Sequence, residues 1–247
     1  MKLSENEKQR FARHLILDEI GEPGQIKLKE SKVLVVGTGG LGSPVLYYLT
    51  AAGVGTIGVV DNDTVDLSNL QRQILHNTGD LRRLKTDSAS EKLKKLSPET
   101  HILSIAERVT EDNVSRIISG YDAIVDATDN FSTRFILNEA CLKAGVPFVH
   151  GGVRGFGGQA MTILPGQGPC LKCIFRTPPK ESQAPPGVVG AVAGTIGTIQ
   201  ALEVLKIILG LGSLLVGRLV IYDALEVSLR EITVYQNPNC ELCANPG

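Results

Sequence analysis

Short apolar runs alternate with amphipathic segments along the first 155 residues of the chain. Runs rich in Val and Ile predict buried β-strands, and apolar residues at helical spacing between them predict helices. This alternation predicts an α/β fold of the doubly wound, Rossmann-like class, with a mostly parallel sheet covered by helices on both faces. The predicted strands cover residues 33–36, 56–60, 102–105, 123–125 and 147–150, and the predicted helices cover residues 4–18, 85–96, 111–119 and 131–144, with another running from a glycine turn to about residue 52.

The pattern changes after residue 155. Residues 157–164 and 219–234 predict strands of an antiparallel type, and residues 176–187 contain four prolines, which predicts a flexible loop. We therefore expect one domain with three parts, namely an N-terminal helical arm over residues 1–28, a core over residues 29–155 and a C-terminal portion over residues 156–247.

The segment 188–215 is apolar and long enough to suggest a membrane span. Gln200, Glu203 and Lys206 interrupt it, and charges at a helix centre are costly in hydrocarbon. We expect a core helix packed through its small residues, which could also supply a dimer face.

Composition excludes several classes of protein. The chain has 247 residues and a net charge of −1, so no bulk basic field attracts nucleic acid or a membrane surface. The N-terminus is polar and lacks the apolar centre of a signal peptide. Four of the five cysteines stand in CxxC pairs, which favours a reducing compartment and a metal over disulfides. We expect a cytoplasmic protein.

A glycine turn follows the first predicted strand. Gly37, Gly39 and Gly42 form GxGxxG, with Gly40 inside it, and such a turn places a phosphate on a helix N-terminus. ATP, NAD and flavin would each fit. Asp61 follows the next strand, where an aspartate can accept hydrogen bonds from ribose hydroxyls, although it could also be a helix cap or turn residue.

Basic and amide groups come next along the chain. Arg72 and Lys85 suit the charge of a nucleoside triphosphate better than that of NAD. The alternative is a solvated basic face, and we assign no role to the neighbouring Arg82 and Arg83. Asn69 and Gln73 lie in the same segment, DLSNLQRQ.

Asp129 follows another strand, in DATDN. An acid beside a triphosphate is a natural Mg²⁺ ligand, because magnesium binds one or two carboxylates plus phosphate oxygens. Asp126 is the competing candidate and could instead orient the loop. Either residue could cap the helix that begins near Phe131.

Two CxxC pairs, Cys170/Cys173 and Cys240/Cys243, predict a closed four-thiolate zinc site of a structural kind. A redox role for one pair is the alternative. Cys141 is most simply a core residue, and the four histidines show no metal-ligand spacing.

Taken together, these segments resemble the MoeB/ThiF/HesA family of ubiquitin-activating-enzyme-like adenylyltransferases. The resemblance runs nearly from end to end: RFARHLIL, GTGGLGS, DNDTVDLSNLQRQILH, Lys85, DATDN, PCLKC, the glycine-rich helix and NPNCELC. It implies ATP and Mg²⁺ as cofactors, beside Zn²⁺ in the cysteine site. It also implies adenylation of the C-terminal glycine of a small ubiquitin-like sulfur carrier of the MoaD/ThiS type, with release of pyrophosphate, for molybdopterin, thiamin or related biosynthesis.

The resemblance further implies a homodimer in which Arg13 reaches the ATP of the second subunit, with Arg10 close by. On this basis residues 29–155 bind the nucleotide, and residues 156–247 bind the carrier and zinc. The implied nucleotide and metal positions are Gly37, Gly39, Gly40, Gly42, Asp61, Asp63, Asn69, Arg72, Gln73, Lys85 and Asp129, of which Arg72, Lys85 and Asp129, together with Arg13, would be catalytic.

One departure concerns sulfur handling. Some relatives carry a cysteine just before the glycine-rich helix, whereas the loop here reads ESQAPPGVVG, with Gln183 near that position. We expect adenylation only, with a separate sulfurtransferase. An NAD(P)- or flavin-dependent oxidoreductase and a non-catalytic nucleotide-binding scaffold remain as alternatives.

Overall fold

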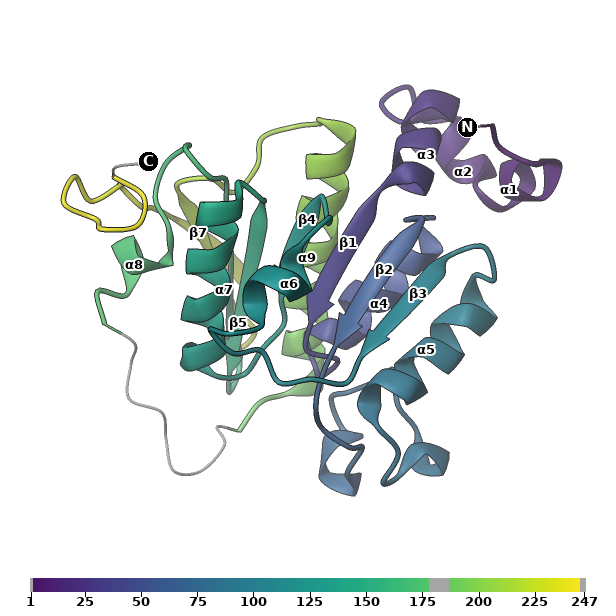
Figure 1. Ribbon diagram of the computed structural model, residues 1–247, viewed down its shortest axis with the longest axis horizontal. Helices are drawn as coiled ribbons and strands as arrows, with labels where there is room; N and C mark the ends of the chain where they lie inside the picture. Colours follow the sequence, from purple (N-terminus) through teal and green to yellow (C-terminus); the bar gives the residue numbers. More distant parts are fainter. Residues whose placement is uncertain (1, 178–186, 245–247) are drawn as a thin grey trace.

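The computed structural model describes residues 2–177 and 187–244. In this part of the chain the strands form one sheet in the order β3-β2-β1-β4-β5-β6-β7-β8 (Figure 1). The first five strands are parallel, and β5 to β8 pair antiparallel, which confirms the predicted fold class. The strands are β1 (Lys32–Val36), β2 (Thr56–Val60), β3 (His101–Ile105), β4 (Ala123–Asp126), β5 (Phe148–Arg154), β6 (Gly157–Ile163), β7 (Arg218–Asp223) and β8 (Ser228–Thr233).

Helices cover both faces of the sheet. Along β1, Val33 and Val35 point into one apolar cluster while Leu34 and Val36 point into another, because successive side chains of a strand alternate between faces. The first cluster lies under α4 (Gly42–Ala51), α5 (Lys85–Leu96) and α9 (Gly190–Leu209), and the second lies under α6 (Val114–Ile118), α7 (Phe131–Ala144) and α8 (Leu171–Ile174).

Helix α9 is long and apolar enough to cross a membrane, and half of its most apolar window is buried. Its polar residues make specific contacts inside the protein. Gln200 Nε2 donates to the carbonyl of Asp126 at 2.7 Å, and the Glu203 carboxylate accepts from the Thr162 hydroxyl at 2.5 Å. These contacts identify α9 as a core helix, as the sequence predicted.

The N-terminal arm differs from the prediction of one helix over residues 4–18. It contains α1 (Glu5–Arg10) and α2 (Ala12–Leu15), followed by α3 (Gly21–Glu30), although α3 begins with residues that usually interrupt a helix. The chain turns at buried Phe11, whereas Ile16 is 70% exposed and does not join a buried face. Gly21, the first residue of α3, has a φ of +54°, which glycine adopts at little cost, and proline is tolerated in a first helical turn, where Pro23 lies.

Candidate functional site

The predicted nucleotide residues follow neighbouring parallel strands. Val36 pairs with Val60 on one side and with Asp126 on the other, so Gly37, Asp61 and Ala127 leave the sheet together at its carboxyl edge. This edge lies at the bottom of Figure 1. Ligands of open α/β sheets bind outside this edge.

The glycine turn is closely packed. Gly37 has a φ of +99°, and a Cβ there would lie 2.5 Å from the carbonyl oxygen of Ala127. A Cβ on Gly42 would lie 1.9 Å from the carbonyl oxygen of Gly37. Both positions therefore require glycine. The turn leads directly into α4, so the N-terminus of a ten-residue helix faces the edge.

Asp61 is fixed against this turn. Its Oδ2 accepts from the backbone N–H and the hydroxyl of Thr38 at 2.9 and 2.8 Å, and its Oδ1 accepts from the Asp63 N–H at 2.9 Å. Since a carboxylate offers about four acceptor positions, one remains for a ribose hydroxyl. Asp61 caps no helix in the described structure, and Thr38 is a partner that the sequence did not reveal.

Lys85 begins α5 and is only 6% exposed. Its Nζ donates to Oδ2 of Asp63 at 2.9 Å, and its backbone N–H donates to the Asp63 carbonyl. These contacts bring together two of the predicted residues.

The DLSNLQRQ segment folds back over the glycine turn. A Cβ on Gly39 would lie 3.6 Å from the Gln73 amide nitrogen, and a Cβ on Gly40 would lie 3.5 Å from Cγ of Arg72. The Gln73 amide oxygen is buried without a hydrogen-bond partner in the described structure. Asn69 and Arg72 bond within their own turn, to the Asp66 N–H and the Ser68 carbonyl.

His76 is a further buried residue at the turn, which sequence reasoning missed. Its Nε2 donates to the Thr38 carbonyl at 3.2 Å, and its Nδ1 accepts from the Ser88 hydroxyl at 2.8 Å. We assign the Nε2–H tautomer because a carbonyl can only accept. Burial lowers the pKa of His76, so the ring is neutral near pH 7 and links the turn to α5.

The two acidic candidates after β4 differ in burial. Asp126 is fully buried, and its carboxylate accepts from Arg134, His150 and Thr128. Burial opposes its charge, but Arg134 and the hydrogen bonds hold the pKa of Asp126 below its usual value. Asp129 is exposed at the edge. Neither residue caps α7, because the Asn130 side chain accepts from the Thr133 N–H in that role.

The N-terminal arginines lie elsewhere. The arm packs at the amino end of β2, where a Cβ on Gly53 would meet the Phe11 ring at 2.5 Å. Arg10 donates to the Leu96 carbonyl at the C-terminus of α5, and Arg13 is exposed on α2. The structure therefore does not bring either arginine to the glycine turn of its own chain.

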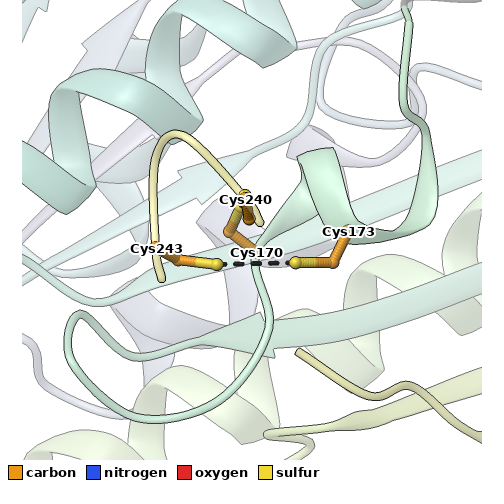
Figure 2. A group of neighbouring side chains, drawn as sticks. All are labelled: Cys170, Cys173, Cys240 and Cys243. Atoms are coloured by element: carbon orange, nitrogen blue, oxygen red, sulfur yellow. Dashed lines mark hydrogen bonds between the residues drawn. The ribbon is translucent and has the colours of Figure 1, made fainter. Parts of the chain in front are cut away.

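The four cysteines of the two CxxC pairs lie close together in space (Figure 2). All four Sγ atoms lie within 4.8 Å of one another, and two of the distances are 3.4 Å for Cys173–Cys243 and 3.7 Å for Cys170–Cys240. Tetrahedral zinc with bonds of about 2.3 Å requires sulfur separations of about 3.8 Å, so the arrangement fits that ion. Both of these contacts join one CxxC pair to the other, so the four thiols form a single cluster.

The surroundings of this cluster shift the pKa values of its thiols in opposite directions. Burial raises the pKa of Cys170 to about 11. At Cys240 burial acts in the same direction, but hydrogen bonds from the Leu242 and Cys243 backbone outweigh it and lower the pKa to about 7. The Asn237 N–H donates to Cys173 Sγ at 3.4 Å. The cluster joins the C-terminal tail to α8.

The protein therefore combines a Rossmann-like sheet, with a glycine turn and a buried lysine at its carboxyl edge, and a separate cluster of four cysteines that could hold a metal ion. The chain belongs to the ThiF family, whose model matches residues 11–242. This family is the one that the sequence motifs resembled.

Similar proteins give the class of enzyme. The chain is 42% identical to a SAMP-activating enzyme E1 of Haloferax volcanii, covering 100% of this chain and 93% of the relative. It is 42% identical to a sulfur carrier protein adenylyltransferase of Thermus thermophilus, covering 99% and 94%. It is 44% identical to adenylyltransferase and sulfurtransferase MOCS3 of Drosophila grimshawi, of which it spans 56%. The prediction of an adenylyltransferase is confirmed at the level of enzyme class.

Solved structures support the fold. A crystal structure of E. coli MccB with ATP has a TM-score of 0.86 and 24% identity, with coverage of 96% of this chain and 75% of that chain.

Proposed function

We propose that this protein uses ATP to adenylate the C-terminal glycine of a small ubiquitin-like sulfur carrier ending in Gly-Gly, and releases pyrophosphate. The chain spans nearly the full length of two relatives named for the activation of SAMP and of a sulfur carrier. The observation that carries the proposal is the nearly buried ammonium group of Lys85 at the carboxyl edge, because a triphosphate needs such a cation and an NAD-dependent oxidoreductase does not.

The nucleotide would lie across the turn. The α4 N-terminus and the turn from Gly37 to Gly42 would bind phosphate, and Asp61 would accept from the ribose. Asp63, Asn69, Arg72, Gln73 and Lys85 would surround the phosphates. Exposed Asp129 would hold Mg²⁺, which neutralises phosphate charge when bound.

The chemistry requires alignment of two anions. The carrier carboxylate is already a nucleophile, so no general base is needed. It attacks the α-phosphorus, and the bond to pyrophosphate breaks. Arg72 and Lys85, with Arg13 from the second subunit of a homodimer, would stabilise the charge that develops on pyrophosphate.

Sulfur transfer would occur elsewhere. The loop before α9 contains no cysteine, so we propose that a separate sulfurtransferase receives the acyl-adenylate. Residues 178–186 of that loop, including Gln183, lie outside the described residues. A trapped thioester or acyl-disulfide between this chain and a carrier would contradict the proposal. Molybdopterin, thiamin and related cytoplasmic pathways supply suitable carriers.

Pyrophosphate exchange tests the function. Labelled pyrophosphate should enter ATP only when a Gly-Gly carrier is present, and a carrier lacking its last glycine is the control. Carrier-independent reduction of a nicotinamide would favour the oxidoreductase. Nucleotide binding without either reaction would favour the scaffold.

A further inference from the structure

The loop that carries Asp129 lies on a buried ion pair. Arg134 of α7 donates from Nε to Asp126 Oδ2 at 2.8 Å, and the Arg134 and Asp126 side chains are only 6% and 0% exposed. From Nη2 it donates to the carbonyls of Thr128 and Gly151, at 2.7 and 3.1 Å. One guanidinium therefore joins the end of β4, the loop and β5.

Asp126 fixes the same loop from the other side. Its Oδ1 accepts from the N–H and hydroxyl of Thr128 at 3.1 and 2.6 Å, and its Oδ2 also accepts from His150 Nδ1 at 2.8 Å. With Arg134, these donors occupy the four acceptor positions of the carboxylate. Asp126 thus has no free position for a metal ion.

Both neighbours of Asp129 are held in place. Thr128 is bound by Asp126 and Arg134, and Asn130 caps α7 through the Thr133 N–H. The Arg134 guanidinium also lies 5.0 Å from the centroid of the Phe131 ring. That ring packs edge-on against Phe175 at 5.4 Å. Asp129 is the exposed residue between these anchored neighbours.

We infer that Arg134 is a positioning residue, which sets the Asp129 carboxylate for the cation of MgATP without touching either. This inference rests on the proposed function. The planar guanidinium group of arginine is needed for this positioning, because a lysine keeps the charge but cannot reach a carboxylate and two carbonyls at once. Loss of residues that orient a metal ligand costs about 10- to 100-fold in metal affinity.

The test compares nucleotide binding with and without magnesium. In Arg134→Lys, calorimetry should show MgATP affinity reduced by about 10- to 100-fold, with ATP affinity in EDTA within about twofold of wild type. In carrier-dependent exchange, the Mg²⁺ concentration for half-maximal rate should rise, and excess Mg²⁺ should restore much of the rate. If Arg134 had a purely structural role, the variant would lose affinity for MgATP and for ATP in EDTA to the same extent.

Arg218→Lys is the matched control, because Arg218 also bridges a carboxylate and two carbonyls, at β7. It should change neither affinity. If Arg134→Lys does not fold, the pair Asp126→Asn with Arg134→Gln removes both buried charges and should show the same magnesium-specific loss. Equal magnesium dependence in wild type and variant would overturn the positioning role alone. A wild-type protein that binds no MgATP would overturn the proposed function and this inference together.

Discussion

Lys85 Nζ lies 2.9 Å from Asp63 Oδ2, and the two side chains differ widely in exposure, at 7% for Lys85 and 61% for Asp63. A carboxylate that is mostly in water can lose this partner at low cost. We therefore expect the ammonium group, which is fixed at the edge of the sheet, to exchange this partner for an incoming phosphate. Several variants separate this role from stability.

Lys85→Met should reduce carrier-dependent exchange by about 100-fold or more, because one fixed charge at the developing pyrophosphate is lost. Its free energy of unfolding should change by less than about 1 kcal/mol, since Asp63 is exposed. Exchange kinetics and urea unfolding measure the two effects.

Lys92→Met is the matched control on the same helix. Lys92 pairs with Asp80, whose side chain is 4% exposed, so the variant leaves a buried carboxylate short of a partner. We expect a loss of about 1–3 kcal/mol in stability with exchange largely retained. Equal losses of exchange in both variants would contradict a special role for Lys85.

Arg13 should act across a dimer, because the arm places it away from its own glycine turn. Arg13→Ala and Lys85→Met should each be inactive alone. After unfolding and refolding as a mixture, about a quarter of the sites should combine an intact lysine with an intact arginine and regain exchange. No recovery in mixed dimers verified by mass would remove Arg13 from the site.

The cysteine cluster should hold one zinc ion per chain. Cys240→Ser should lose the metal and lower the melting temperature, because the tail is then no longer joined to α8. Cys141→Ser should keep the metal, since Cys141 lies outside the cluster. Elemental analysis measures the zinc content of the two variants. A wild-type protein that is free of metal after purification without chelator would contradict the zinc site.

Arg82→Gly should stabilise the protein. Arg82 is exposed and has a φ of +67°, which costs a non-glycine residue about 1 kcal/mol. Allowing for the greater chain entropy of glycine, we expect a gain of about 0.5 kcal/mol. Arg83→Gly should destabilise instead, because Arg83 pairs with Asp80 and Glu91. The melting temperatures of both variants, measured by thermal unfolding, test this prediction. A lower melting temperature for Arg82→Gly than for wild type would contradict it.

Stability should fall as the pH falls below about 6.5. Burial lowers the pKa of both His76 and His150, so the unfolded chain binds more protons than the folded chain at mildly acidic pH. The stability that these two neutral histidines contribute is fully present above the pKa of histidine in the unfolded chain, and it is lost as the pH decreases. His150→Gln should show a smaller loss than wild type between about pH 7.5 and 5.5 in urea unfolding. Identical dependence of the unfolding free energy on pH in wild type and His150→Gln would refute this role of His150.

Local patterns were enough to predict most of the sheet and the cysteine cluster. Apolar runs mark β1, β2 and β4 because buried parallel strands need them. The spacing of each CxxC pair is enough to predict that its two thiols lie close together. The contacts between distant residues could not be predicted in this way. Thr38 meets Asp61 across 23 positions, and Arg134 meets Gly151 across 17, only because the sheet brings strand ends together. Gly21 and Pro23 signal a break locally, whereas packing of the arm makes them the start of α3.

The most direct test of the proposed function is mass spectrometry of a Gly-Gly carrier incubated with this protein and MgATP, in the absence of any sulfur donor. The predicted product is a carrier with AMP on its terminal glycine, formed by wild type and formed more slowly, by about 100-fold or more, with Lys85→Met. An unmodified carrier, despite binding of both the carrier and MgATP, would contradict adenylation as the function.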